Sequence, residues 1–375
     1  MAARIRLPKL PLNLDILDAE MGDAMKSTTM LAIVLGGLGA IAALGQIPNP
    51  PGLTTGPGVQ AARDTKEPEV LKTCKVPPPP PRPFPRRPPA AAAEPASKEV
   101  KEIPGVVAAG AQWKEIWEVD GNNADGIIAT KDGGILIAQN DKSDVIKLDK
   151  DGKTSIAYMG TNTGGALAMN SKGALFIDNR GLNASIEELA PKQRTLANKY
   201  NGDSFDCIGG VLNDLTADSK GGAYFTMGQV FYSDSQGKVT KYSDGLFTNG
   251  IVLSADEKHL FVTNGPAVVE FDVQKDGSLT NQREFAKLTG GGFGGDGSTF
   301  DSQGRLYVTT NGGVDVISPD GKNLGLIPTP HDVISVVFSG PERKTLYAVA
   351  RDNALNKDWI IAIPTIAQGP KGRGK

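Results

Sequence analysis

The stretch LNDLTADSKGGAYFT, Leu212 to Thr226, places a polar pair before a short apolar strand, a glycine-containing turn and a second apolar strand. The same order returns in TNGIVLSADEKHLFVTN, which begins at Thr248, and in GDGSTFDSQGRLYVTT, which begins at Gly295. Each copy predicts a β-hairpin, because two runs rich in β-branched and aromatic residues flank a turn. The recurrence of one order along the chain predicts a repeat architecture.

Six such units follow one another between residues 111 and 368. Their first strands open at Asp125, Gly165, Asn213, Asn249, Asp296 and Ser335. The spacings of 40, 48, 36, 47 and 39 residues match the period of about 40 to 50 residues that marks a four-stranded propeller blade. The sequence therefore predicts an all-β fold, a six-bladed β-propeller of four-stranded blades. A β-sandwich or a pair of smaller all-β domains is the alternative.

The sixth unit has one strand fewer than the others, since only TLYAVA and WIIAIP follow its first strand. We expect the missing strand to be QWKEIWEV, Gln112 to Val119, at the start of the domain. Pairing the two ends of the domain would close the ring and remove an exposed sheet edge.

The chain before the repeats is divided into three segments. Residues 1–24 form an N-terminal extension, and residues 25–45, MKSTTMLAIVLGGLGAIAALG, have the lysine, apolar run and small residues of a signal peptide. The apolar run is shorter than the roughly twenty residues of a membrane-spanning helix, which favours a cleaved signal over an uncleaved membrane anchor. Residues 46–110 are rich in Pro and Ala and predict an extended linker that tethers the domain to a membrane or cell wall. We expect a periplasmic or extracellular protein.

The composition limits the partners. The 375 residues are 39% hydrophobic and 22% charged, as in a soluble globular protein, and the net charge of -2 predicts no nucleic-acid partner. Two cysteines, Cys74 and Cys207, exclude a Cys-rich metal site. They either form one disulfide, in an oxidising compartment, or stay as two thiols.

The residues that open the six first strands should meet in a ring, because these strands line the central channel of a propeller. Four of them offer side-chain oxygen atoms, which suit a hard divalent cation such as Ca²⁺. These four are Asp125, Asn213, Asn249 and Asp296. Zinc fits less well, because the only histidines, His259 and His331, have no second His or Cys at ligand spacing.

Asp-Gly and Asn-Gly pairs are also common in turns, and any one of the four is more often a turn residue than a ligand. Their equivalent places in four repeats favour the metal site. Three further pairs fall between outer strands and are predicted to be hairpin turns: Asp151-Gly152, Asp244-Gly245 and Asp320-Gly321.

The three quoted stretches, with GGDGSTFDSQGRLYVTTNGGVDVISPDGKNLG from Gly294 as the fullest, resemble blades of the gluconolactonase family. This family includes the senescence marker protein and resembles diisopropyl fluorophosphatase. The resemblance covers the whole predicted propeller. It implies a calcium-dependent hydrolase of lactones or related esters, whose ion is held at one channel mouth by a Glu, two Asn and an Asp.

Carried onto this chain, the resemblance matches the two Asn to Asn213 and Asn249. It matches the Asp, both ligand and catalytic carboxylate, to Asp296, which would act as general base or nucleophile. The family's Glu falls on Asp125, one methylene shorter. Val211 stands where the animal sugar-lactone hydrolases carry an Arg, so a polyhydroxylated substrate is less well supported.

Two further residues are candidates for substrate contact. Phe293, in the glycine run TGGGFGGDG, would form an apolar wall, unless the run is a surface loop. His331 precedes Ser335 by four residues and would be a proton shuttle or substrate contact, unless it is structural. His259, at the start of a second strand, is predicted to be structural.

A rival hypothesis is a non-catalytic, tethered propeller that binds a polymer or protein partner at the same mouth. The four oxygen ligands favour the enzyme. The change from Glu to Asp125 and the missing Arg at Val211 favour the binding module. A third class, a metal-free propeller synthase, would lack these ligands.

Overall fold

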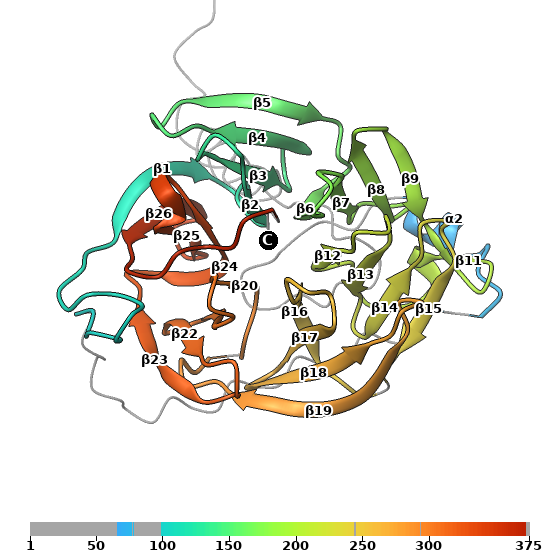
Figure 1. Ribbon diagram of the computed structural model, residues 1–375. Helices are drawn as coiled ribbons and strands as arrows, with labels where there is room; N and C mark the ends of the chain where they lie inside the picture. Colours follow the sequence, from blue (N-terminus) through green and yellow to red (C-terminus); the bar gives the residue numbers. More distant parts are fainter. Residues whose placement is uncertain (1–65, 77, 79–98, 244, 293, 373–375) are drawn as a thin grey trace, which may run out of the picture. The chain divides into compact units, whose positions relative to one another are not determined.

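The computed structural model describes residues 66–76, 78, 99–243, 245–292 and 294–372. In this part of the chain, six four-stranded antiparallel sheets are arranged in a ring around a central axis (Figure 1). The predicted six-bladed, all-β propeller is confirmed. The inner strand of each sheet comes first in the chain, except that the sixth sheet takes its outermost strand from the start of the domain.

The blades follow the chain in order. Blade 1 consists of β2 (Ile127–Ala129), β3 (Ile135–Gln139), β4 (Asp144–Leu148) and β5 (Thr154–Met159). Blade 2 consists of β6 (Gly164–Met169), β7 (Leu175–Asn179), β8 (Ser185–Ala190) and β9 (Arg194–Ala197). Blade 3 consists of β12 (Leu215–Ala217), β13 (Ala223–Thr226), β14 (Val230–Ser233) and β15 (Val239–Tyr242). Blade 4 consists of β16 (Thr248–Leu253), β17 (His259–Asn264), β18 (Ala267–Val273) and β19 (Leu279–Lys287). Blade 5 consists of β20 (Ser298–Phe300), β21 (Leu306–Thr310), β22 (Gly313–Ile317) and β23 (Asn323–Pro328). Blade 6 consists of β24 (Asp332–Ser339), β25 (Thr345–Asp352), β26 (Lys357–Pro364) and β1 (Lys114–Asp120). Smaller elements are α2 (Glu67–Leu71), the hairpin of β10 (Lys199–Tyr200) and β11 (Asp203–Ser204), and the 3-10 turns η1 (Phe205–Cys207) and η2 (Pro341–Arg343).

The ring closes as the sequence predicts. Strand β1 pairs antiparallel with β26, from Lys114 opposite Ala362 to Asp120 opposite Lys357. The pairing joins the start of the domain to its end, so that the last blade has the same four strands as the others.

The core lies between neighbouring blades. In blade 1 the second strand, β3, is buried along its whole length, whereas the outermost strand, β5, is almost wholly exposed. One core cluster joins blade 1 to blade 2 through Ile128, Leu167 and Ile177. Inner strands are covered by a blade on each side, and this explains why they appear in the sequence as short continuous apolar runs.

The glycines that follow three of the four candidate ligands are not turn residues. Gly126, Gly250 and Gly297 lie outside the positive-φ region, in contrast to Gly152 at +80° and Gly321 at +84°. A Cβ on Gly250 would lie 2.1 Å from the carbonyl oxygen of Asp296 in the next blade, and one on Gly126 would lie 2.6 Å from the Cα of Ala166. These glycines are needed because neighbouring backbones approach closely there.

Of the three other Asp-Gly pairs, two lie where the sequence predicts them. The pairs Asp151-Gly152 and Asp320-Gly321 lie in turns between outer strands, and their glycines adopt left-handed backbone. The third prediction is wrong: Gly245, with φ +91°, lies in the connection from β15 to β16, between blades 3 and 4, and not in a hairpin between outer strands. Asp244 lies outside the described residues.

The packed part of the chain begins earlier than the predicted domain boundary at residue 111. Val100, Ile103, Val106 and Val107 are buried in one cluster with residues of blades 5 and 6. The backbone N–H of Ile366 also donates to the carbonyl of Val106, at 2.9 Å. The composition of residues 46–110 as a whole concealed this short apolar segment.

Residues 1–24 and 25–45 and most of the predicted linker lie outside the described residues. Among the described residues, no helix has the length and apolar character needed to cross a membrane.

One end of the described linker is fixed to the propeller by a disulfide. Cys74, just after α2, is bonded to Cys207 in η1, with 5.5 Å between the two Cα atoms. The neighbouring backbone N–H of Lys75 donates to Asp203 Oδ1 at 3.1 Å. Of the two alternatives left open by the sequence, the structure has the bridge.

We predict that Cys74→Ser destabilises the protein by about 2–4 kcal/mol, because the bridge joins residues 133 apart in sequence and restrains the unfolded chain. Chemical denaturation with and without reductant measures the effect. Reductant should lower the midpoint of the wild-type protein to that of the variant and leave the variant unchanged. Equal denaturation midpoints for the wild type and Cys74→Ser in the absence of reductant would contradict the prediction.

We predict that Gly250→Ala costs about 1–3 kcal/mol, because its Cβ would collide with backbone of the neighbouring blade at Asp296. Gly152→Asn is the matched control. Its position has nothing within 4 Å and a left-handed φ of +80° that Asn tolerates. Thermal melts of both variants test the difference. A Gly250→Ala protein as stable as the control would contradict the prediction, because the backbone at Asp296 would then move away from the added Cβ at no cost in stability.

Candidate functional site

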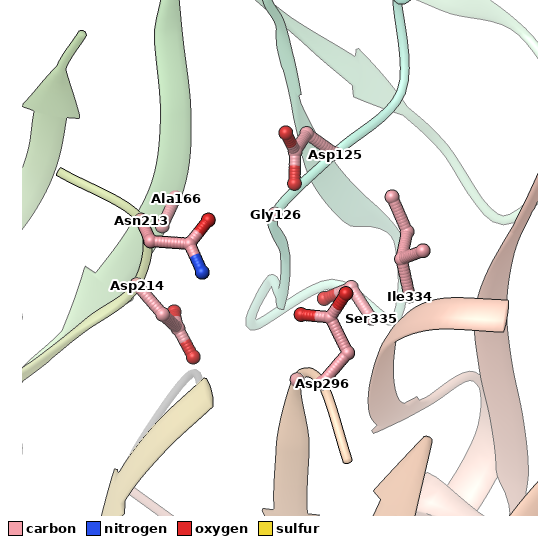
Figure 2. A pocket seen from close by; sticks show the side chains of 9 residues that line it. Asp125, Gly126, Ala166, Asn213, Asp214, Asp296, Ile334 and Ser335 are labelled. Carbon is pink, nitrogen blue, oxygen red and sulfur yellow. The ribbon is translucent and has the colours of Figure 1, made fainter. Parts of the chain in front are cut away.

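The structure brings the four predicted ligands together at one mouth of the channel. A pocket there is lined by residues of five blades (Figure 2): Asp125, Gly126, Ala166, Asn213, Asp214, Asp296, Gly297, Ile334 and Ser335. Asn249, from blade 4, is linked to this group because the Asn213 side-chain amide donates to its Oδ1. All four candidate ligands are half-buried. Their role as ligands stays a prediction.

Three of these residues are positioned by one recurring backbone bond. The N–H groups of Asp125, Asn213 and Asp296 donate to carbonyls of the second strand in their own blades, at 2.9 to 3.1 Å. Each ligand thus stands just before its inner strand and extends the hairpin by one pair. Asn249 lies within the inner strand β16 itself.

The carboxylate of Asp125 is held by two donors that the sequence analysis did not identify. Its Oδ2 accepts from Asn140 Nδ2 at 2.8 Å and from Arg180 Nη1 at 2.6 Å. Arg180 also donates from Nε to Asp178 Oδ2 at 3.1 Å and from Nη2 to the carbonyl of Asn213. Arg180 directly follows Asn179, the last residue of a second strand, and that position was the only sequence signal for it.

The ring position of blade 2 is a glycine for a steric reason. A Cβ on Gly165 would lie 1.8 Å from Arg180 Cζ. The space that a side chain would fill at this position is therefore taken by the guanidinium of Arg180.

Asp296 is in a different electrostatic position from Asp125. Burial, followed by the charges of Asp125 and Asp214, raises the pKa of the Asp296 carboxyl to about 7. No Lys, Arg or His in the described chain makes an ion pair with it. The carboxylate of Asp214 binds backbone groups instead: its two oxygens accept from the N–H groups of Leu215 and Ile251 at 2.8 and 2.9 Å.

This arrangement fits a calcium ion. The donors are two carboxylates and two amides, all oxygen ligands, and a half-buried carboxylate without a cationic partner is a group that a cation would stabilise. Zinc is disfavoured because no His or Cys lines the pocket in the described chain.

The two predicted substrate contacts have different outcomes. Phe293 lies outside the described residues. His331 is not among the residues that line the pocket. Its ring stacks on Trp359, with centroids 4.4 Å apart and planes 4° apart, and its Nε2 lies 3.7 Å from Glu115 Oε1. These contacts favour the structural alternative, and a role in catalysis stays a prediction.

A second group of metal-type ligands lies in blade 4, away from the channel. His259 Nδ1 is 2.8 Å from Glu270 Oε1 and 3.7 Å from Asp272 Oδ1. Arg283 already binds both carboxylates, at 2.9 and 2.8 Å. The group is an ion-pair cluster, which agrees with the structural role predicted for His259.

Fold and site together define a six-bladed propeller with oxygen donors gathered at one channel mouth. Residues 154–351, more than half of the chain, match the family described as SMP-30/Gluconolactonase/LRE-like region. The chain belongs to this family, as the resemblance of its blades predicted.

Individual relatives agree. The chain is 26% identical over 215 residues to a gluconolactonase of Zymomonas mobilis, an alignment that covers 49% of this chain and 59% of that protein. It thus spans less than two thirds of this curated relative. The solved gluconolactonase of Xanthomonas campestris has a TM-score of 0.60 at 20% identity, over 71% of this chain and 94% of that one. Regucalcin of Agrobacterium tumefaciens, described as a calcium-binding protein, has a TM-score of 0.56 at 18% identity, over 69% and 96%.

We predict that Asp296→Asn stabilises the metal-free protein at pH 8 but much less at pH 5. The pKa of this carboxyl is about 7 when folded against an ordinary 3.8, so the folded state prefers the protonated form. The stability from this proton is present below pH 4 and is lost as the pH rises through 7.

Because the side chain keeps some contact with solvent, which screens its charge, we expect a gain of only about 1 kcal/mol at pH 8, or about 2–4 °C in melting temperature. Melts in chelator at both pH values measure it, with Asp151→Asn on an exposed turn as control. An equal gain at the two pH values would rule out the titration of Asp296 as its cause.

Proposed function

We propose that this protein is a calcium-dependent hydrolase of lactones or related esters. The observation that carries the proposal is the meeting of four oxygen donors, one of them Asp296, whose carboxylate makes no ion pair in the described chain. Membership of a family that contains gluconolactonases supports the same reaction class.

Asp125, Asn213, Asn249 and Asp296 would hold the ion. When bound, it supplies Lewis-acid polarisation of the substrate carbonyl and stabilises the oxyanion that forms. The amides of Asn213 and Asn249 contribute oxygen without charge, so the two carboxylates balance a divalent cation.

Asp296 is the residue proposed to move the proton. In one route its carboxylate accepts a proton from water as the water oxygen bonds to the carbonyl carbon. The acyl carbon–oxygen bond then breaks, and the proton passes to the leaving oxygen, which gives a hydroxy acid from a lactone. In the other route the carboxylate attacks the carbonyl carbon, and the acyl carbon–oxygen bond breaks to give a mixed anhydride. The leaving oxygen takes a proton from water, whose oxygen then bonds to the anhydride carbon and releases the hydroxy acid and the Asp296 carboxylate.

The pocket wall carries no cation that would bind a polyhydroxylated substrate. Ala166, Ile334 and the glycines 126 and 297 lie beside the polar Asp214 and Ser335, and no Lys or Arg is among the described residues that line the pocket. Val211 likewise adds no cation before Asn213. Lactones and esters with few hydroxyl groups are therefore proposed ahead of sugar lactones.

Export is proposed together with this activity. The signal-like segment at residues 25–45 and the Pro-rich linker support it. The Cys74–Cys207 bridge supports it independently, because structural disulfides persist mainly in oxidising compartments.

A binding module remains the second candidate, and one observation favours it. Asp125 is already paired with Arg180 at 2.6 Å, so one of the four ligands is shared with an internal cation. A propeller of this kind would bind a partner at the mouth without turnover.

The test is hydrolysis of a panel of lactones and esters by the full chain, with calcium, after chelation and after calcium is restored. We predict that chelation lowers the rate at least 100-fold, that calcium restores it, and that Asp296→Ala lowers it by about 10²–10⁴. Asp151→Ala, on an exposed hairpin, is the matched control and should keep full activity.

Calcium binding without turnover of any panel member would favour the binding module. Hydrolysis that survives both the chelator and Asp296→Ala would refute the proposed site.

A further inference from the structure

Arg180 joins three blades at the channel mouth. Its guanidinium donates to Asp125 of blade 1, to Asp178 of its own blade and to the carbonyl of Asn213, just before the first strand of blade 3. Two of these partners belong to predicted calcium ligands: the side chain of Asp125 and the backbone carbonyl of Asn213. Arg180 is therefore in direct contact with the candidate ion site.

The position of Arg180 is built into the fold. The residue is 8% exposed and Asp178 is fully buried. Moving the guanidinium away would leave that buried carboxylate without its cation, which is costly. Gly165 provides the space, since a Cβ there would collide with Arg180 Cζ. An arginine also keeps its charge at any physiological pH.

The mouth is consequently divided into two electrostatic halves. On one side Asp125 and Asp178 share the charge of Arg180, at 2.6 and 3.1 Å. On the other side Asp296 has no cationic partner among the described residues. An ion that enters must share Asp125 with a fixed positive charge, and like charges at short range repel strongly in a partly buried site.

We propose that Arg180 is an intramolecular competitor of the divalent cation at Asp125, which lowers the calcium affinity of the mouth. The inference rests on the calcium site of the proposed function.

Two variants separate the guanidinium from the ligands. Arg180→Gln removes its charge. Gly165→Ala keeps every charge and every ligand but places a Cβ 1.8 Å from Arg180 Cζ, so that the flexible end of Arg180 must leave its position. Arg194→Gln, which breaks a pair with Glu188 at 2.7 Å on the outer strands of the same blade, is the matched control.

The experiment is isothermal titration of the chelator-treated full chain with calcium chloride alone. We expect Arg180→Gln and Gly165→Ala to bind calcium at least tenfold more tightly than the wild type, and Arg194→Gln to bind within twofold of it. Circular dichroism confirms folding. Gly165→Ala decides the result if Arg180→Gln does not fold with Asp178 left unpaired.

Unchanged or weaker binding by the folded variants, or no binding by any of the proteins, overturns the inference. Failure of the proposed function is distinguishable. Tighter calcium binding by the variants in a protein that hydrolyses no lactone or ester supports the inference and rejects the hydrolase. Calcium-dependent hydrolysis by the wild type, with no change of calcium affinity in the variants, supports the hydrolase and rejects the inference about Arg180.

Discussion

The close approach of the first strands around the channel is the constraint on which the mouth depends. At Gly126, Gly250 and Gly297 the backbone of the next blade leaves no room for a side chain. The residue before each of these glycines is a candidate ligand. Asp125 and Asp296 line the same pocket (Figure 2), and Asn249 is linked to it through Asn213. The Asp-Gly and Asn-Gly pairs at the mouth thus combine two requirements, an oxygen donor and a position without a Cβ.

The electrostatics of the mouth follow from which carboxylates have partners. Asp214 and Asp178 are satisfied by backbone N–H groups and, for Asp178, by Arg180. Asp214 joins blade 3 to blade 4 through Ile251, whereas the partners of Asp178 lie within blade 2. Both carboxylates have little capacity left for a ligand. Asp296 makes no ion pair among the described residues, and burial together with the charges of Asp125 and Asp214 raises its pKa, although a hydrogen bond from Asn249 acts in the opposite direction. Asp125 lies between these cases, because it is both a candidate ligand and the partner of Arg180.

The chain before the first blade contributes more than a tether. Strand β1 completes blade 6, and Val100 to Val107 pack under blades 5 and 6. The Cys74–Cys207 bridge attaches an earlier segment near the connection between blades 2 and 3. Each of these contacts joins distant parts of the chain. The disulfide persists on unfolding and restrains the unfolded chain, whereas the strand pairing and the apolar packing stabilise only the folded state.

The sequence by itself determined the repeat, the number of blades, the closing strand and the residues that open the first strands. These are set by local periodicity and turn chemistry, which a single chain records directly. Only the tertiary structure decided that Arg180 reaches Asp125, 55 residues away, that Cys74 meets Cys207, and that His331 stacks on Trp359. These pairings depend on how the blades are placed in space, and no short-range pattern in the sequence encodes that placement.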